Sequence, residues 1–378
     1  MNSHATNPAK RYIFVVFALV LLAGILVGAP QTPRELTNEQ FWKLATESSE
    51  NDGEFRSDNL LSNETTFQYV IPQILSTAKL GRVYLGVGPE QNFTYMAALK
   101  PSMAFIIDIR HGNFDVHLMY KALFEMSKDR PDFVSRLFSR KRPEGLTSQS
   151  SPDEIFSAIL SAETSREFYE ENLKAIEDHL MKKRGFPLTE GDREGIAWAL
   201  GNYHRFGPYI NYGSSLSSGS AAPQIVGASG GGIGGRGGNN GVTYHVLMTV
   251  DDGRGLNRSY LATEENFNVL KDLHTRNLIV PVVGNFAGDK AIRAVGTYLK
   301  GAGGMVSAFY LSNVEQYLGV AGWESFCRSV LTLPIDETSV FIRSGRGGPF
   351  TVNSSGPNVQ NSSTARMSDE LKCTTEVR

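Results

Sequence analysis

The sequence has few cysteines and almost no net charge. Its 378 residues include two cysteines, and the formal net charge is -2. Cys327 and Cys373 lie far apart, and Cys373 belongs to a polar tail, so their spacing predicts neither a disulfide framework nor a cysteine metal site. A nearly neutral chain has no general attraction for nucleic acid, and no nucleic-acid partner is expected.

Several motifs of catalysis and binding are absent or incomplete. The sequence has no Gly-x-Ser-x-Gly elbow, which argues against a serine hydrolase of that type. A dinucleotide fingerprint needs three glycines, and the turn GVGPEQ has two. His111 and His117 lie near Asp108 and Asp115, but no set of three metal ligands is visible, so no metal is expected.

One long hydrophobic run is present, near the amino terminus. Residues 12–29 are uncharged and, at about 1.5 Å per residue, nearly span a hydrocarbon core of about 30 Å. Lys10 and Arg11 precede the run, so residues 1–30 are expected to hold a single-pass transmembrane helix with the folded domain on the extracytoplasmic side. A cleaved signal peptide is the alternative, and the chain would then be secreted or periplasmic.

The rest of the chain divides into three stretches. Residues 31–63 are polar and acidic, which predicts a linker with one short helix, and the polar residues 345–378 predict a disordered tail. Residues 64–344 alternate apolar runs with helical patterns, as is typical of an α/β domain with a doubly wound, mostly parallel sheet. Within that domain, residues 139–212 predict a helical insertion, and residues 213–241 predict a flexible Gly/Ser loop.

Short apolar runs in this domain are expected to be the strands of one sheet. They are rich in β-branched and aromatic residues and are bounded by turn residues. They comprise residues 83–87, 104–109, 245–250, 278–283, 307–311 and 339–344.

The stretch from residue 83 to 113 is typical of a nucleotide-binding fold. Gly86 and Gly88 form a turn before a predicted helix, where a ligand could approach the backbone and free N–H groups. Asp108 ends the next strand, 20 residues after Gly88, where an acid can bind ribose hydroxyls. Glu90 would repel a pyrophosphate, which argues against NAD or FAD and favours a cationic ligand such as S-adenosylmethionine (SAM). A capped glycine turn without a ligand is the alternative.

Several sequence motifs resemble those of known protein families. YLGVGPE and FIIDIR occupy the places of the first two motifs of the class I SAM-dependent methyltransferase fold, a Rossmann-like fold. More closely, YLGVGPEQNFTY, FIIDIRHGN, HLMYKALFEMS and FYLSNVEQYL resemble a family of bacterial proteins of unknown function with a methyltransferase-like Rossmann fold. This resemblance extends from about residue 66 to residue 343.

The resemblance implies a cofactor and a set of site residues. SAM would bind at the glycine turn, and residues after a later strand, Asn313 and Glu315, would face the methyl acceptor, with Glu315 as a possible base. The sulfonium is already activated, so alignment of the acceptor would do most of the catalytic work. The expected cofactor-binding residues are Gly86, Gly88, Glu90, Asp108 and Arg110.

Two functions therefore follow as expectations. The first is a membrane-tethered methyltransferase that binds SAM. The second is a catalytically inactive binding or structural module at the membrane, because SAM is made in the cytoplasm while the charge pattern places the domain outside.

Overall fold

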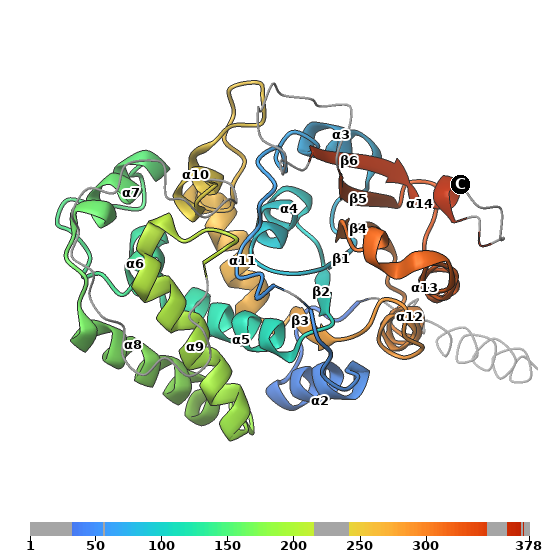
Figure 1. Cartoon of the computed structure of the whole chain (residues 1–378), viewed down its shortest axis with the longest axis horizontal. Helices are drawn as coiled ribbons and strands as arrows, with labels where there is room; N and C mark the ends of the chain where they lie inside the picture. The colour runs from blue at the N-terminus through green and yellow to red at the C-terminus, as the bar shows by residue number, and fades with distance from the viewer. Residues whose placement is uncertain (1–31, 56, 215–241, 346–360, 372, 374–378) are drawn as a thin grey trace, which may run out of the picture.

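The computed structural model describes residues 32–55, 57–214, 242–345, 361–371 and 373 (Figure 1). The expected membrane segment and nearly all of the expected Gly/Ser loop lie outside these residues. Within the described part of the chain, no helix combines the length and the apolar character that a membrane crossing requires.

The described residues form a six-stranded sheet in the order β3-β2-β1-β4-β5-β6. The first five strands in this order are parallel, and β6 pairs antiparallel with β5. The protein is therefore a mixed α/β protein with a mostly parallel sheet, as the alternating pattern predicts. The strands are β1 (Val83–Gly86), β2 (Met103–Asp108), β3 (Ile279–Val283), β4 (Val306–Ser312), β5 (Val340–Gly345) and β6 (Asn361–Arg366).

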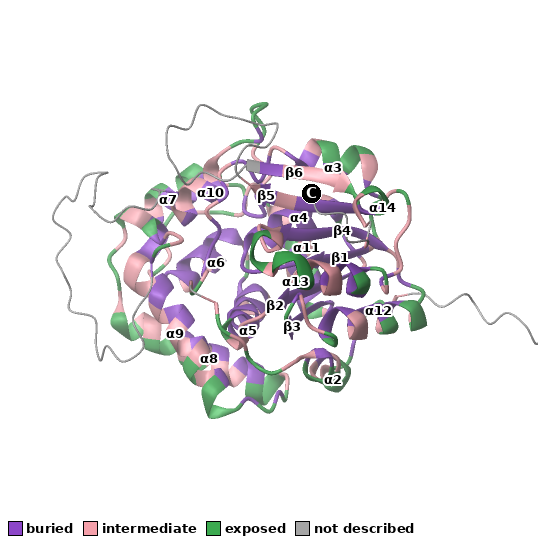
Figure 2. Cartoon of the chain, turned by 45° about the vertical axis from the view of Figure 1, so that its right-hand side comes forward, coloured by how far each residue is buried: buried purple, intermediate pink, exposed green. Residues whose placement is uncertain are grey.

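Helices cover both faces of the sheet. α4, α5 and α11 lie on one side of the strands, and α12 and α13 lie on the other (Figure 1). Both faces of the central strands are therefore apolar, and β1, β2 and β3 are buried along their whole length (Figure 2). The α-helices of this core are α2 (Asn38–Ser48), α3 (Ile71–Thr77), α4 (Gln91–Leu99), α5 (His111–Met126), α6 (Arg130–Leu137), α11 (Glu264–Thr275), α12 (Ala291–Gly301), α13 (Glu315–Val330) and α14 (Met367–Glu370).

The expected helical insertion contains a further group of helices on the side of α5 and α6 (Figure 1). Ser151 caps the first of these through a capping box with Glu154. The elements are α7 (Pro152–Ser161), α8 (Arg166–Asp178), the π-helix η1 (His179–Lys183), α9 (Glu190–Phe206) and the 3₁₀-helix η2 (Gly207–Tyr209).

The strand predicted at residues 245–250 is wrong. This run belongs to helix α10 (Tyr244–Thr249), whose N-cap Thr243 accepts a hydrogen bond from the backbone N–H of Val246. An apolar run of six residues fits a buried helix as well as a buried strand, and the capping threonine decides for the helix. Strand β3 comes from the next apolar run along the chain.

The segment predicted as a linker packs on the edge of the sheet. The backbone N–H of Glu50 donates to the carbonyl of Val283 at the end of β3, at 2.8 Å. Phe41 and Ala45 of α2 are fully buried. Residues 32–50 are thus part of the folded domain rather than a linker, although α2 lies where the sequence predicts one short helix.

The expected disordered tail is also partly wrong. Residues 361–366 form β6, which completes the sheet beside β5, and α14 follows directly. A disulfide joins Cys327 of α13 to Cys373, with the two Cα atoms 5.6 Å apart. The spacing of the two cysteines did not predict this disulfide, because they are 46 positions apart in the sequence. β6 and α14 bring the chain back to α13, so the two residues meet in the fold.

Candidate functional site

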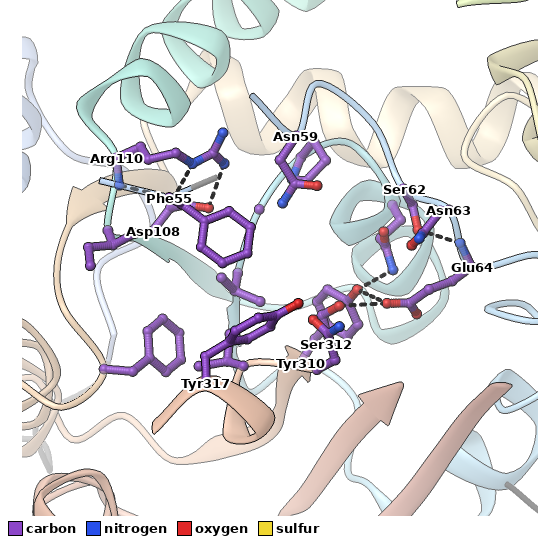
Figure 3. A pocket seen from close by; sticks show the side chains of 18 of the residues that line it. Phe55, Asn59, Ser62, Asn63, Glu64, Asp108, Arg110, Tyr310, Ser312 and Tyr317 are labelled. Atoms are coloured by element: carbon purple, nitrogen blue, oxygen red, sulfur yellow. Dashed lines mark hydrogen bonds and ion pairs between the residues drawn. The ribbon is translucent and has the colours of Figure 1, made fainter. Parts of the chain in front are cut away.

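A cavity of about 500 Å³ opens at the carboxyl ends of the parallel strands (Figure 3). The strand order reverses between β1 and β4, and in open α/β sheets this switch point is where ligands bind. Residues from the segment before β1 cover the cavity and share its lining with residues that follow the strands. The lining comprises Glu54, Phe55, Asn59, Ser62, Asn63, Glu64, Val87, Gly88, Pro89, Gln91, Asp108, Ile109, Arg110, Tyr212, Asn285, Phe286, Ala287, Tyr310, Ser312, Asn313, Val314, Tyr317 and Leu318.

An ion pair forms one side of the cavity. Asp108, at the end of β2, accepts hydrogen bonds from Nε and a terminal nitrogen of Arg110, each at 3.0 Å. The backbone N–H of Arg110 donates to the same carboxylate at 3.0 Å. Arg110 also donates to the carbonyls of Ser57 and Asp58, so it fastens the segment before β1 onto the sheet edge.

A buried carboxyl group forms the opposite side. Glu64 accepts hydrogen bonds from Tyr310 at 2.6 Å and from Ser312 at 2.7 Å (Figure 3). Ser362 of β6 donates to its second oxygen at 3.3 Å. Burial raises the pKa of Glu64 above its ordinary value, and the hydroxyl groups of Tyr310 and Ser312 oppose the rise. The residues that hold Glu64 are therefore neutral donors.

Strained backbone marks the same side of the cavity. Ser312, the last residue of β4, has a φ of 50°, and the pairing of β4 with β5 shifts register between Tyr310 and Ser312. The left-handed conformation costs of order 1 kcal/mol for a residue other than glycine. In return, the irregularity lets both Tyr310 and Ser312 donate to Glu64.

Aromatic rings lie between the two polar sides. Phe55 and Tyr317 pack edge to face with ring centroids 5.2 Å apart, and Figure 3 shows both between Asp108 and Glu64. Tyr317 is 43% exposed, so its ring is open to a molecule that enters the cavity. Aromatic walls with polar groups at both ends are typical of a site for a small ring-containing ligand.

The glycine turn is held from behind by Asn92. The side-chain amide of Asn92 donates to the carbonyls of Val87 at 2.9 Å and Pro89 at 2.7 Å, and its oxygen accepts from Tyr84 at 2.8 Å. A Cβ on Gly86 would lie 1.9 Å from that oxygen, so Gly86 makes room for Asn92 and does not line the cavity. Gly88, with a φ of 76°, does line it.

Glu90 lies away from the cavity. Its side chain is fully buried near Tyr120, Tyr203 and Tyr244, and it is not in the lining. Burial raises its pKa to about 8, against a lowering by backbone N–H groups of Glu90 and Ser62. Neutral Glu90 is then the predominant form at pH 7, so it cannot be the repelling charge that the sequence suggests.

Of the two residues expected to face the methyl acceptor, one lines the cavity and the other does not. Asn313 lines the cavity, directly after β4. Glu315 does not, and both its oxygens pair with Arg343 of β5, at 2.6 and 2.9 Å. Both oxygens of Glu315 are thus occupied by the guanidinium group, outside the cavity, so Glu315 is not placed to take a proton from a bound acceptor. Glu64 is the carboxyl group that the cavity presents instead.

His117 supports the turn and should make the fold sensitive to acid. Its Nε2 lies 2.9 Å from the Gly88 carbonyl, and burial lowers its pKa to about 4 from an ordinary 6.5. The unfolded chain therefore binds the proton first, and the stability present above pH 6.5 should be lost as pH falls towards 4, by about 3 kcal/mol. Urea unfolding at pH 7 and 4.5 measures the loss.

The matched variant for this prediction is His117→Gln. Glutamine keeps an N–H donor for Gly88 but does not titrate, so its stability should fall less between the two pH values. His274 is also buried, with a pKa well below its ordinary value, and it cancels from the comparison. Equal losses in both proteins would show that His117 does not bind a proton on unfolding.

The chain matches a family of proteins whose function is unknown. Residues 60–186 and 244–375 match a domain of unknown function, DUF7790, and these ranges contain the parallel sheet and most of the cavity. No curated protein matches the chain. Because this match covers more than half of the sequence, the chain belongs to the DUF7790 family.

Proposed function

We propose that the cavity binds a nucleoside-containing cation, with SAM as the first candidate, and that the fold is a SAM-methyltransferase-like Rossmann fold. The observation that carries this proposal is that Gly88 and Asp108 line one cavity at the switch point of the sheet. These two positions are the ones at which such folds hold the far end of a nucleoside ligand and its ribose.

The charges of the cavity favour a cationic ligand over a phosphorylated one. Arg110 is already paired with Asp108, and Glu64 is held by hydroxyl groups. A pyrophosphate would meet Glu64 and Glu54, and among the described lining residues the sole Lys or Arg is Arg110, which is already paired. The ammonium group of SAM would instead give Glu64 a positively charged partner and favour its ionised form.

Asp108 can bind ribose while it stays paired with Arg110. Each carboxylate oxygen has two acceptor sites, and the guanidinium group takes one on each. The backbone N–H of Arg110 takes the second site on Oδ1, so one site, on Oδ2, remains for a ribose hydroxyl. Asn313 and Tyr317, which follow β4, would then face the methyl acceptor, whose alignment with the sulfonium provides the catalysis.

Calorimetric titration of the purified chain with SAM and S-adenosylhomocysteine tests this proposal. Asp108→Asn keeps the shape of the side chain but weakens its acceptors, and it should raise the Kd about tenfold or more. NAD and ATP should bind more weakly than SAM, because each brings phosphate to the acidic side of the cavity.

The matched control is Asp336→Asn. It also breaks an Asp–Arg pair, between Asp336 and Arg82 at 2.8 Å, but Arg82 precedes β1 at the opposite edge of the sheet. SAM should bind this variant as it binds the wild type. Equal binding to Asp108→Asn and the wild type would show that the ribose does not bind at Asp108.

An inactive binding or structural module is the second candidate, and the Cys327–Cys373 disulfide favours it. Disulfides persist mainly in oxidising compartments, which agrees with the proposal of a single-pass anchor, or a cleaved signal, that places the domain outside the cytoplasm. SAM is made in the cytoplasm. If no heat appears at roughly millimolar SAM, this second function replaces methyl transfer.

A further inference from the structure

Three side chains with metal-ligating atoms meet where α5 begins beside α9. His111 is the first residue of α5, Asp115 follows one turn later, and Asp192 lies in the first turn of α9. His111 Nε2 lies 2.7 Å from Asp192 Oδ1 and 3.6 Å from Asp115 Oδ1. One ligand atom from each residue lies within 4.8 Å of the other two. Ligands bound at about 2.0–2.2 Å to one ion are roughly 3 Å apart, so this spacing accommodates an ion.

Asp115 provides an independent sign of a missing ligand. Its side chain is 4% exposed, and in the part of the chain that is described Oδ1 has no hydrogen-bond partner. A buried carboxylate oxygen without a partner is costly, so its retention needs a reason. Gly195 of α9 faces the same carboxyl group, and a Cβ there would lie 2.0 Å from Asp115 Oδ2. The two helices thus pack directly around a carboxyl group whose other oxygen points into the cluster.

The other two side chains are oriented by contacts outside the cluster. Asp192 Oδ2 accepts hydrogen bonds from the backbone N–H and the hydroxyl of Thr189, at 2.6 and 2.8 Å, which directs Oδ1 towards His111. The imidazole ring of His111 stacks on Phe114 with ring centroids 5.3 Å apart, and Asp52 accepts from the backbone N–H of His111 at 2.6 Å. Such supporting contacts are typical of metal ligands. The His111 side chain is 41% exposed, so water can reach the remaining coordination positions.

We propose that His111, Asp115 and Asp192 bind one divalent transition-metal ion, for which Zn²⁺ is the best match. Two carboxylates balance the charge of the ion, and an imidazole nitrogen favours Zn²⁺ over Mg²⁺ or Ca²⁺. The ion would join the helical insertion to α5, next to Arg110 in the cavity lining. The sequence predicted no metal because only two of the three ligands share a helix, and Asp192 comes from α9.

Zinc titration of the chelator-treated, purified chain at neutral pH tests this proposal. Calorimetry should find one Zn²⁺ per chain, and saturating Zn²⁺ should raise the Tm by several degrees because the ion binds the folded state. Asp115→Asn should weaken zinc binding at least tenfold and remove the Tm shift. Without zinc its Tm should equal or exceed that of the wild type, because a buried carboxyl group has been removed.

Two further variants separate a metal site from a structural contact. His111→Gln changes a half-exposed side chain outside the core and should also weaken zinc binding at least tenfold. Glu190→Gln removes an exposed carboxylate from the same turn of α9 and should bind Zn²⁺ as the wild type does. The proposal fails if the wild type binds no Zn²⁺, if Asp115→Asn binds it equally well, or if Mg²⁺ binds with the same affinity.

Discussion

Gly86→Ala should lower the free energy of unfolding by roughly 3–5 kcal/mol. The new Cβ would lie 1.9 Å from Asn92 Oδ1, and Asn92 is fully buried. To make room, Asn92 must leave the carbonyls of Val87 and Pro89 and the hydroxyl of Tyr84. The loss combines overpacking with several buried polar groups left without partners. Urea unfolding followed by circular dichroism measures it.

Gly112→Ala is the matched control. Gly112 lies in the first turn of α5, and apart from its chain neighbours and the backbone of its own helix, no heavy atom of the described residues lies within 4 Å of where its Cβ would be. Alanine should leave the stability unchanged or raise it by up to about 1 kcal/mol, because it suits a helix better than glycine. If Gly86→Ala unfolds at the same urea concentration as Gly112→Ala, the account of the turn is incorrect.

Reduction of the Cys327–Cys373 disulfide should cost about 4 kcal/mol of stability. The two cysteines are 46 positions apart, so the bond restricts a long loop in the unfolded chain. The same bond holds the residues after β6 against α13. Unfolding with and without dithiothreitol measures the effect. The Cys373→Ala variant should be as stable as the reduced wild type, and its stability should not change when dithiothreitol is added.

The same cysteines report on the compartment. A chain purified from its host after rapid alkylation should show no free thiol, because the proposed location is oxidising. Two alkylated cysteines would instead place the domain in a reducing compartment. That result would remove the main objection to SAM as a ligand.

The parallel sheet could be predicted because its strands are short, β-branched and apolar. The run at residues 245–250 shares these features, but Thr243 caps it as a helix. β6 could not be predicted, because its sequence NSSTAR has no apolar alternation. It is a strand because β5 offers a free edge for pairing, which is a tertiary effect.

The part of the cavity at the carboxyl ends of the strands could also be predicted from the sequence. Gly88, Asp108 and Arg110 follow strands, and the carboxyl ends of parallel strands meet at one edge. Phe55 lies before the first strand, in a polar stretch that resembles a linker, and Glu64 is the first residue after that stretch. No local pattern signals that this stretch folds over the cavity, because its partners, Tyr310 and Tyr317, are distant in the sequence.

A crystal structure of the chain with S-adenosylhomocysteine tests the central claim most directly. We expect the ligand between the β1 and β4 ends of the sheet, with a ribose hydroxyl on Asp108 and its amino-acid end near Glu64. Tyr317 should contact the bound molecule, because its exposed ring borders the cavity. Saturating ligand that leaves the cavity without density, or that binds at another place on the chain, would contradict the claim.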